Sequence, residues 1–375
     1  MMLPYFAEEY GNSTSPHEAG RAASNAIATA RQQVADAAGA KPECIIFTGS
    51  ATESNNIAIL GVANARHHRL KIVVSAVEHK SVLEPAFHLR QHGYAVETIS
   101  VDSNGVVDLH EAEKLIDDQT LIVSVQGANN ETGVIQPIRQ IVQLAHDRGV
   151  LCHCDAAQMF GKVPVNIEEL GVDIASFSAH KTYGPKGIGA LFVAPHIAGT
   201  ISPIFFGGHQ ERGLRPGTQN VPAIVGFGCA CQVARDLVQS DAKRVSILRE
   251  QLESKLLATI PESRVNASNA MRLPGTISLT IPGMPADMLI ANLPTVCISN
   301  GSACNSGALE PSHVLLAMNL SRAEAESTLR ISLGRYTTEK DVVTASREIA
   351  DAACHLRTQL NRSRNRVLST GGHNQ

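Results

Sequence analysis

Short apolar, β-branched segments alternate with amphipathic segments over the first two thirds of the chain. The apolar segments lie at 44–50, 71–79, 95–101, 121–129, 150–157, 173–180 and 189–194. Their nearly continuous apolar character is typical of strands that are buried on both faces. Helical periodicity marks segments between them, such as 54–69 and 137–149, the second of which ends at Gly149. This alternation predicts an α/β fold with a mostly parallel central sheet and helices on both faces.

A different pattern begins beyond residue 216. One long helical run covers 217–260, and short strands follow at 275–281 and 329–334, with a glycine-rich loop between them and a final helix after them. We therefore predict a large domain over 1–238 and a smaller α+β domain over 239–375.

Composition narrows the class of protein. With 43% hydrophobic and 18% charged residues among 375, the chain is an ordinary globular one. A formal net charge of −3 provides no positive electrostatic potential that would attract nucleic acid or an anionic membrane, so neither is expected as a partner. No apolar run approaches the about 20 residues that span a bilayer, and no secretory signal is recognisable. The eight scattered cysteines favour a reducing compartment, and we expect a cytoplasmic protein.

Cys152, His153 and Cys154 stand in a row within one predicted strand. Adjacent strand residues point to opposite faces, so the histidine cannot join both cysteines at one metal ion without distortion. Buried structural cysteines are therefore favoured over a metal site, and no metal is predicted.

Polar residues follow several of the predicted strands. Because ligands of parallel sheets gather at the carboxyl ends of the strands, these residues are candidates for one site. They are His79, Asn130, Asp155 with Gln158, and Ser178 with His180 and Lys181. The segment 48–56 leads from a strand through small residues into a helix. The start of a helix favours a bound anion. A capped helix start without any ligand explains this segment equally well.

This combination suits pyridoxal 5'-phosphate. The cofactor needs a lysine for its Schiff base, an acid beside its pyridine nitrogen, a donor for its phenolate oxygen, a flat partner for its ring and a phosphate cradle. Lys181 is the candidate for the Schiff base, Asp155 for the acid and Gln158 for the phenolate donor. His79 is the candidate for the flat ring partner. The phosphate cradle would consist of Thr52, Ser178 and His180. Burial at a strand end would disfavour the charged form of Lys181 and bring its titration towards neutral pH.

The motifs of the chain resemble those of a known family. They are similar to those of the cysteine desulfurases, pyridoxal-phosphate enzymes of the aminotransferase class V type with fold type I. The motifs include "TGSATESNN" (48–56), "NNETGVIQP" (129–137), "SAHKTYGPKGIG" (178–189), "GGHQERGLRPGTQN" (207–220), "GSACNSGALEPSHVL" (301–315) and "LRISLGRYTT" (329–338). They stand in the family's order between about Tyr10 and about Thr338.

The resemblance implies a role for each matching residue. Lys181 would carry the cofactor, His79 would stack on its ring and Asp155 would face its pyridine nitrogen. Asn130 and Gln158 would lie near the ring substituents, and Ala51, Thr52, Ser178 and His180 would hold the phosphate. Thr218 would reach the phosphate of a second subunit, which implies a homodimer, and Arg330 would bind the substrate carboxylate.

The sulfur chemistry of the family would rest on Cys304. Its surroundings are small and polar, as suits a thiolate that takes sulfur from L-cysteine as a persulfide and carries it to a sulfur-acceptor protein, leaving L-alanine. The loop resembles the longer version found in the desulfurases of nitrogenase and iron–sulfur-cluster assembly. The destination of the sulfur stays open between iron–sulfur-cluster assembly, tRNA thiolation and DNA phosphorothioation.

Two alternatives remain at this point. A selenocysteine lyase or another class V lyase would share the fold and the cofactor. An inactive cofactor-binding scaffold is the other, because the sequence has no counterpart of the family's opening Tyr-x-Asp-x-x-Ala-Thr-Thr-Pro segment.

Overall fold

The computed structural model describes residues 1–65, 68–300 and 310–370, which fold into two compact units. Unit 1 comprises residues 1–102, 106–130 and 135–240. Unit 2 comprises residues 103–105 and 131–134 and the chain from residue 241 onwards. Two short segments of the N-terminal half therefore belong to the C-terminal unit.

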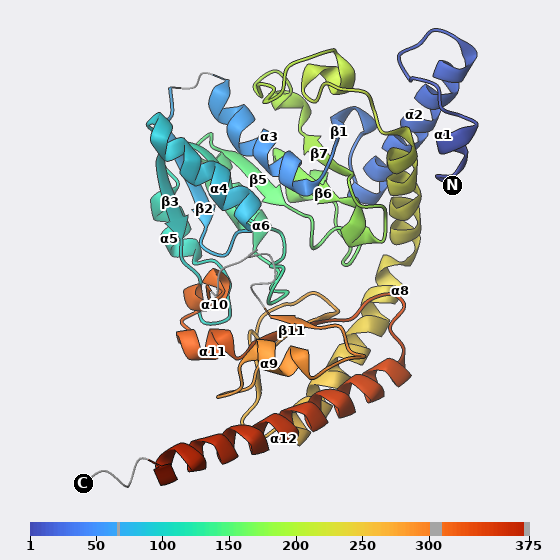
Figure 1. The fold of residues 1–375 in the computed structure, drawn as a ribbon. Coiled ribbons are helices and arrows are strands. Elements are labelled where there is room, and N and C mark those ends of the chain that lie inside the picture. Colours follow the sequence, from blue (N-terminus) through green and yellow to red (C-terminus); the bar gives the residue numbers. More distant parts are fainter. Residues whose placement is uncertain (66–67, 301–309, 371–375) are drawn as a thin grey trace. The chain divides into compact units, whose positions relative to one another are not determined.

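A seven-stranded sheet forms the centre of unit 1 (Figure 1). Across the sheet, the order is β1 (Ile45–Thr48), β7 (Gly189–Val193), β6 (Ile174–Ser178), β5 (Leu151–Asp155), β4 (Thr120–Ser124), β2 (Lys71–Ser75) and β3 (Ala95–Ile99). Strands β3, β2, β4, β5 and β6 are mutually parallel, whereas β7 is antiparallel to both β6 and β1. The predicted mostly parallel sheet is confirmed.

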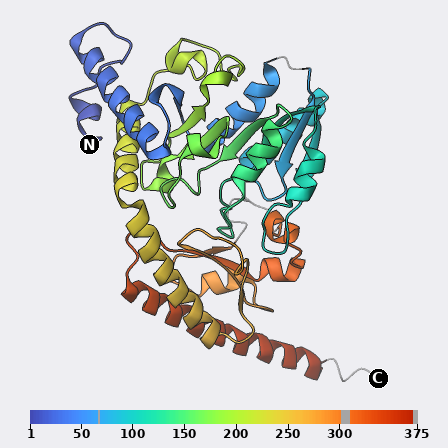
Figure 2. The same cartoon turned by 180° about the vertical axis from the view of Figure 1, so that it is seen from behind.

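The helices cover both faces of this sheet. Those of unit 1 are α1 (Pro4–Ala7), α2 (Glu18–Ala38), α3 (Ala51–Asn64), α4 (Lys80–Leu89), α5 (Leu109–Leu115), α6 (Ile138–His146), α7 (Ile167–Leu170) and the first half of α8 (Val221–Thr259). The chain moves across the sheet in one direction from β1 to β3 and then reverses. Because crossovers between parallel strands are right-handed, this reversal places α3 and α4 on one face and α5 and α6 on the other (Figures 1 and 2).

Unit 2 is built on a four-stranded antiparallel sheet. Its order is β10 (Ser299–Asn300), β11 (Thr328–Ser332), β9 (Thr276–Thr280) and β8 (Arg264–Val265), and its helices are the second half of α8, α9 (Ala286–Ala291), α10 (His313–Ala317), α11 (Arg322–Glu326) and α12 (Glu339–Thr370). The α8 residues Leu248, Leu252 and Leu256 recur every four positions and enter the core of this unit.

Segment 131–134 adds to unit 2 through backbone contacts. Leu273 N donates to Gly133 O at 2.8 Å, and Val134 forms an antiparallel bridge with Arg272. Gly133 has a φ of +77°, and a Cβ on it would lie 2.7 Å from Cβ of Thr276. Glycine is therefore required here both by the backbone conformation and by the close approach to β9.

Helix α8 is long and apolar enough to cross a membrane, judged by length and composition alone within the part of the chain that the structure describes. Half of its most apolar window is buried inside the structure. Since core helices of soluble proteins meet the same criterion, we interpret α8 as a core helix.

Candidate active site

Two residues of unit 1, His79 and Asp155, lie close enough to act on each other's pKa, and Lys181 acts on both. His79 caps α4, Asp155 ends β5, and Lys181 lies in the 3-10 helix η3 (Ala179–Thr182) that follows β6. The charges of Asp155 and Lys181 act on the pKa of His79, and those of His79 and Lys181 act on the pKa of Asp155. These three residues form the centre of the candidate site.

Asp155 is a buried carboxylate, with 7% of its surface exposed. It accepts hydrogen bonds from Ala157 N at 3.0 Å and from Asn55 Nδ2 at 2.7 Å. Burial raises its pKa above the usual range, and these two hydrogen bonds and the charges of His79 and Lys181 offset only part of that rise. Such a carboxylate, buried but supported by donors and cations, suits the role of partner to a protonated ring nitrogen.

The surroundings of His79 favour the neutral form of its imidazole. Burial lowers its pKa below the ordinary 6.5, Asp155 raises it, and Lys181 and Lys80 lower it further. We predicted this residue at a strand end, but β2 already ends at Ser75 and His79 is the N-cap of α4. Its Nδ1 accepts from Ser81 N at 3.1 Å, which fixes the ring beside the helix start.

The start of α3 lies against the end of β6. Gly189 on β7 pairs with Thr48 on one side and with Ser178 on the other. A Cβ on Gly189 would lie 2.7 Å from Ser50 C and 3.0 Å from Ala51 N, so only glycine allows this approach. The predicted phosphate ligands at the start of α3 and at Ser178 therefore come together in unit 1, beside first-turn N–H groups that have no acceptor within the helix.

His180 lies among positively charged side chains. It is exposed. The partial burial of its side chain is the largest cause that lowers its pKa, and the nearby charges of Lys181, Lys186 and Lys162 lower it further. Three ammonium groups close enough to act on one imidazole make the surroundings of η3 electropositive. An anion such as a phosphate group is favoured there.

A cavity of about 560 Å³ opens beside α3 and α4. Its lining includes two predicted site residues, Thr52 and His79, together with Ser81. The remaining lining residues are Asn56, Leu60, Lys80, Glu84, Pro85 and His88.

Gln158 and Asn130 complete the candidates on the strand-end loops. The amide oxygen of Gln158 accepts from Lys162 Nζ at 2.6 Å in the turn after β5. Asn130 is half-buried and ends the segment 106–130 of unit 1. The preceding Asn129 donates from Nδ2 to Val77 O at 3.1 Å, which holds this loop against the segment that leads to His79.

Thr218 lies exposed on the loop that follows β7. The loop is tied to the start of α3, because Arg215 Nε donates to Glu53 Oε1 at 2.7 Å and the other carboxylate oxygen of Glu53 accepts from Gly49 N at 2.8 Å. On the same loop, Phe206 exposes 89% of its surface.

Arg330 belongs to unit 2, on β11, where it pairs with Ser278 and Ser299. Its charge acts on Glu131, a carboxyl that is 6% exposed and accepts a hydrogen bond from Ser312 Oγ. Burial raises the pKa of Glu131 to about 7, although the Ser312 hydrogen bond and the Arg330 charge lower it.

Glu131→Gln is expected to change how stability depends on pH. The pKa of Glu131 is about 7 in the folded protein against an ordinary 4.5, so the folded state binds this proton more tightly. Its contribution to stability is present below pH 4.5 and is lost as pH rises to about 7. The stability of the variant relative to wild type should therefore increase by on the order of 2 kcal/mol between pH 5 and pH 8.

Urea unfolding followed by far-UV circular dichroism measures this difference, since the chain contains no tryptophan to report by fluorescence. An equal difference between the two proteins at both pH values would contradict the assignment.

The predicted sulfur carrier, Cys304, lies outside the described residues. Among the described cysteines, Cys297 and Cys354 are exposed, Cys229 is half-buried, and the others are buried.

His153, from the row Cys152, His153 and Cys154, is fully buried between two serine hydroxyls. Its Nδ1 lies 2.7 Å from Ser124 Oγ and its Nε2 lies 3.0 Å from Ser176 Oγ. Both ring nitrogens of His153 thus have partners on neighbouring strands.

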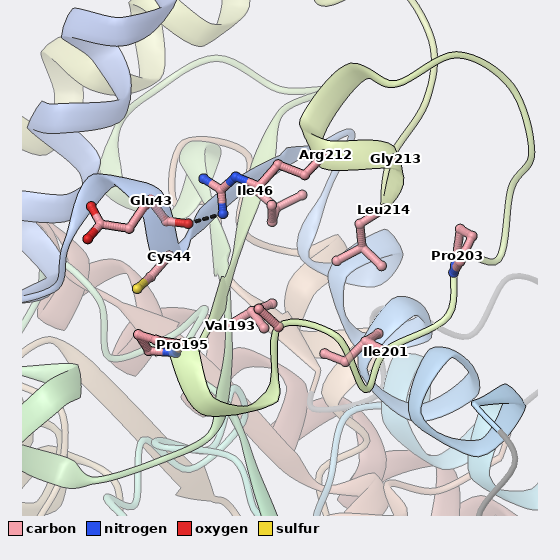
Figure 3. A pocket seen from close by; sticks show the side chains of 11 residues that line it. Glu43, Cys44, Ile46, Val193, Pro195, Ile201, Pro203, Arg212, Gly213 and Leu214 are labelled. Carbon is pink, nitrogen blue, oxygen red and sulfur yellow. Dashed lines mark hydrogen bonds between the residues drawn. The ribbon is translucent and has the colours of Figure 1, made fainter.

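A second cavity, of about 440 Å³, lies elsewhere in unit 1 (Figure 3). Apolar side chains such as Ile46, Val193 and Leu214 line it, and Arg212 donates to the backbone oxygen of Glu43 at its edge. None of the predicted site residues that the structure describes lines this cavity. It is therefore separate from the candidate site.

Sequence reasoning did not identify Asn55, Ser81 or Glu131. Asn55 and Glu131 stand within motifs named above, Ser81 stands two residues after His79, and all three are buried polar residues. Asn55 is fully buried in α3, and a polar residue inside an apolar helix face is a signal that it has a specific partner.

The comparisons with known proteins agree on one family. The family described as aminotransferase class V matches residues 1–344. The chain is 41% identical over 343 residues to a protein named cysteine desulfurase IscS from Rickettsia felis, which covers 91% of this chain and 84% of the relative. Among solved structures, a NifS-like protein superimposes with a TM-score of 0.87 at 38% identity, covering 93% of both chains. A NifS-like protein from Rickettsia africae gives a TM-score of 0.84 at 33% identity and 94% coverage of both.

Proposed function

The chain belongs to the aminotransferase class V family and within it to the cysteine desulfurases, and we propose that it acts on L-cysteine with pyridoxal 5'-phosphate bound at Lys181. The observation that carries this proposal is the cluster of His79, Asp155 and Lys181 in unit 1. It combines the lysine, the buried acid and the flat neutral ring that this cofactor needs.

The residues around this cluster fit the rest of the cofactor. Asp155 would face the pyridine nitrogen, and His79 would stack on the ring. Gln158 and Asn130 would contact the ring substituents. The phosphate would lie at the start of α3 with Ala51, Thr52, Ser178 and His180. Support comes from the missing Cβ of Gly189 and from the lysine charges around His180.

When bound, the cofactor withdraws electrons from the carbon atoms of the substrate. Asp155 would keep a proton on the ring nitrogen: burial raises the pKa of this carboxyl, while the Ala157 and Asn55 donors and the charge of Lys181 favour its ionised form. Arg330 would bind the substrate carboxylate through its planar guanidinium. The Cys304 thiolate would attack the substrate sulfur, forming an S–S bond as the C–S bond breaks; the carbon fragment takes up a proton and leaves as L-alanine.

A homodimer is part of the proposal. Thr218 would complete the phosphate site of a partner subunit. Its exposure, together with that of Phe205 and Phe206 on the same loop, supports a surface that a second copy covers. The persulfide would pass to a sulfur-acceptor protein, and the pathway that receives it stays open.

The test is direct. The purified chain, loaded with pyridoxal 5'-phosphate, is expected to release equimolar L-alanine and sulfide from L-cysteine in the presence of a thiol reductant. Sedimentation of the same preparation should give twice the mass of one chain. A cofactor-loaded protein that releases no alanine would exclude the activity, and a monomer with full cofactor content would exclude the role of Thr218.

The relatives reported above are named cysteine desulfurase or NifS-like protein. No observation on the described residues favours a selenocysteine lyase or an inactive scaffold. We therefore carry neither alternative further.

A further inference from the structure

The side chain of Asn55 connects two parts of the candidate site. It is fully buried on α3, and its Nδ2 lies 2.7 Å from Asp155 Oδ2 and 2.7 Å from Ser81 Oγ. An amide group carries two N–H donors, so both are used, one toward each partner. Asn55 therefore joins the carboxylate at the end of β5 to the first turn of α4.

The orientation of this amide follows from its surroundings. Its oxygen, Oδ1, is buried and has no hydrogen-bond partner among the described residues. The reversed orientation would bury two N–H donors without acceptors and would place the amide oxygen against the Asp155 carboxylate. The observed orientation leaves only one acceptor unpaired and is favoured, although an unpaired buried acceptor still costs about 1–3 kcal/mol.

Ser81 transmits this orientation to His79. Its hydroxyl oxygen accepts from Asn55 Nδ2, so its own proton is available for His79 Nδ1, which lies 2.8 Å away. The backbone N–H of Ser81 also points to that nitrogen, at 3.1 Å. With two donors directed at it, Nδ1 must be the acceptor, and the proton of the neutral ring is on Nε2.

We propose that Asn55 is a positioning residue for the desulfurase reaction: it orients the Asp155 carboxylate and, through Ser81, keeps the proton of the His79 ring on Nε2. One amide thereby sets the acid that would face the pyridine nitrogen and the ring that would stack on the cofactor. The inference rests on the proposed function for its catalytic meaning, whereas the protonation of His79 is a property of the protein itself.

Other groups also act on Asp155 and must be considered. Lys181 is the cationic partner, His79 acts on the carboxylate only to the extent that its ring is protonated, and the N–H of Ala157 is the second donor. Two further titratable groups sense its charge: Glu78, which follows β2 and whose own pKa is raised by burial, and Cys154, its neighbour on β5. Asn55 is the uncharged side chain in this set that donates to the carboxylate, so its removal changes the hydrogen bonding without adding or deleting a charge.

The first experiment tests the position of the proton on His79 without measuring activity. Selective ¹⁵N-histidine labelling of the cofactor-loaded protein, with His79→Gln to assign its resonances, should show the Nε2-protonated form at neutral pH. Ser81→Ala removes the hydroxyl donor and leaves the backbone donor. The Nδ1-protonated share should rise about two- to tenfold in this variant, the equivalent of one ordinary hydrogen bond.

The second experiment tests Asp155 through Asn55→Leu, which keeps the branching and the number of side-chain heavy atoms and removes both donors. A hydrogen bond to a charged group has an effect of about ten- to hundredfold on an ionisation constant. The acid limb of the kcat profile, and the pH titration of the cofactor's visible spectrum, should therefore move to higher pH by about one to two pH units. KM for L-cysteine should stay within about twofold, because no substrate contact is changed. The matched control is Asn64→Leu at the exposed end of the same helix, which should leave both profiles unchanged.

Each outcome decides a separate statement. A wild-type His79 protonated mainly on Nδ1, or an unchanged tautomer ratio in Ser81→Ala, would overturn the inference, and this readout stands even where Asn55→Leu does not fold. Unshifted profiles in a folded Asn55→Leu would overturn the part that concerns Asp155. Failure of the wild type to release alanine would instead remove the proposed function, while the protonation of His79 would still be measurable.

Discussion

Lys181→Ala is expected to abolish the visible absorbance of the lysine-bound cofactor and to reduce alanine release by more than about a thousandfold. No other amine is proposed to bond the cofactor, and Lys181 lies at the centre of the cluster with Asp155 and His79. Absorbance spectra after gel filtration and an alanine assay measure the two effects. Borohydride treatment of the wild type followed by peptide mapping should find the cofactor attached at Lys181.

The matched control for this variant is Lys114→Ala, on the exposed surface of α5, which should behave as wild type. Retained visible absorbance in Lys181→Ala would contradict the assignment. So would attachment of the cofactor to a different lysine after borohydride reduction.

Cys304→Ser is expected to separate cofactor binding from sulfur transfer. The variant should keep the cofactor spectrum and still bind L-cysteine, yet release alanine at least about a hundredfold more slowly and carry no persulfide. The physical reason is that a serine hydroxyl is a far poorer acceptor of sulfur than a thiolate. Mixing with L-cysteine, recording spectra and measuring the intact mass of the protein test all three parts.

Cys354→Ser, at an exposed position of α12, is the control for this variant and should retain both the persulfide and the activity. Wild-type alanine release by Cys304→Ser, or a persulfide located on another cysteine, would place the sulfur carrier elsewhere in the chain.

The sequence predicted the large sheet because each of its strands has a local signature. The apolar segments at 71–79, 121–129, 150–157 and 173–180 each contain, apart from the first residue of β4, one of the parallel strands that lead to the site. The long run at 217–260 became α8, because helical periodicity is likewise local. The antiparallel insertion of β7 between β1 and β6 was not predicted, since strand order depends on contacts between distant segments.

The same distinction applies to the site. His79, Asp155 and Lys181 were predicted as members of one site, since the carboxyl ends of parallel strands converge. Asn55 and Ser81 were not predicted, because their importance depends on the side chains to which they form hydrogen bonds and not on a position at the end of a strand. For Glu131 the position itself was misleading. The residue belongs to a motif attributed to the large domain, whereas its carboxyl is buried in unit 2 beside Ser312.

The assignment of residues 131–134 to unit 2 has a consequence for how the chain acquires its structure during synthesis. Glu131 and Ser312 are 181 positions apart, so the segment leaves the ribosome long before its partner has been made. Until then, Gly133 and Val134 lack the residues 272–276 with which they pair and pack. Closing so long a loop has an entropic cost that local helices do not have, and contacts of this kind slow folding. Maturation of the C-terminal unit is therefore expected to be post-translational and slower than that of the sheet of unit 1. A fragment beginning at Asp241 would lack part of its own framework, however completely its remaining residues were translated.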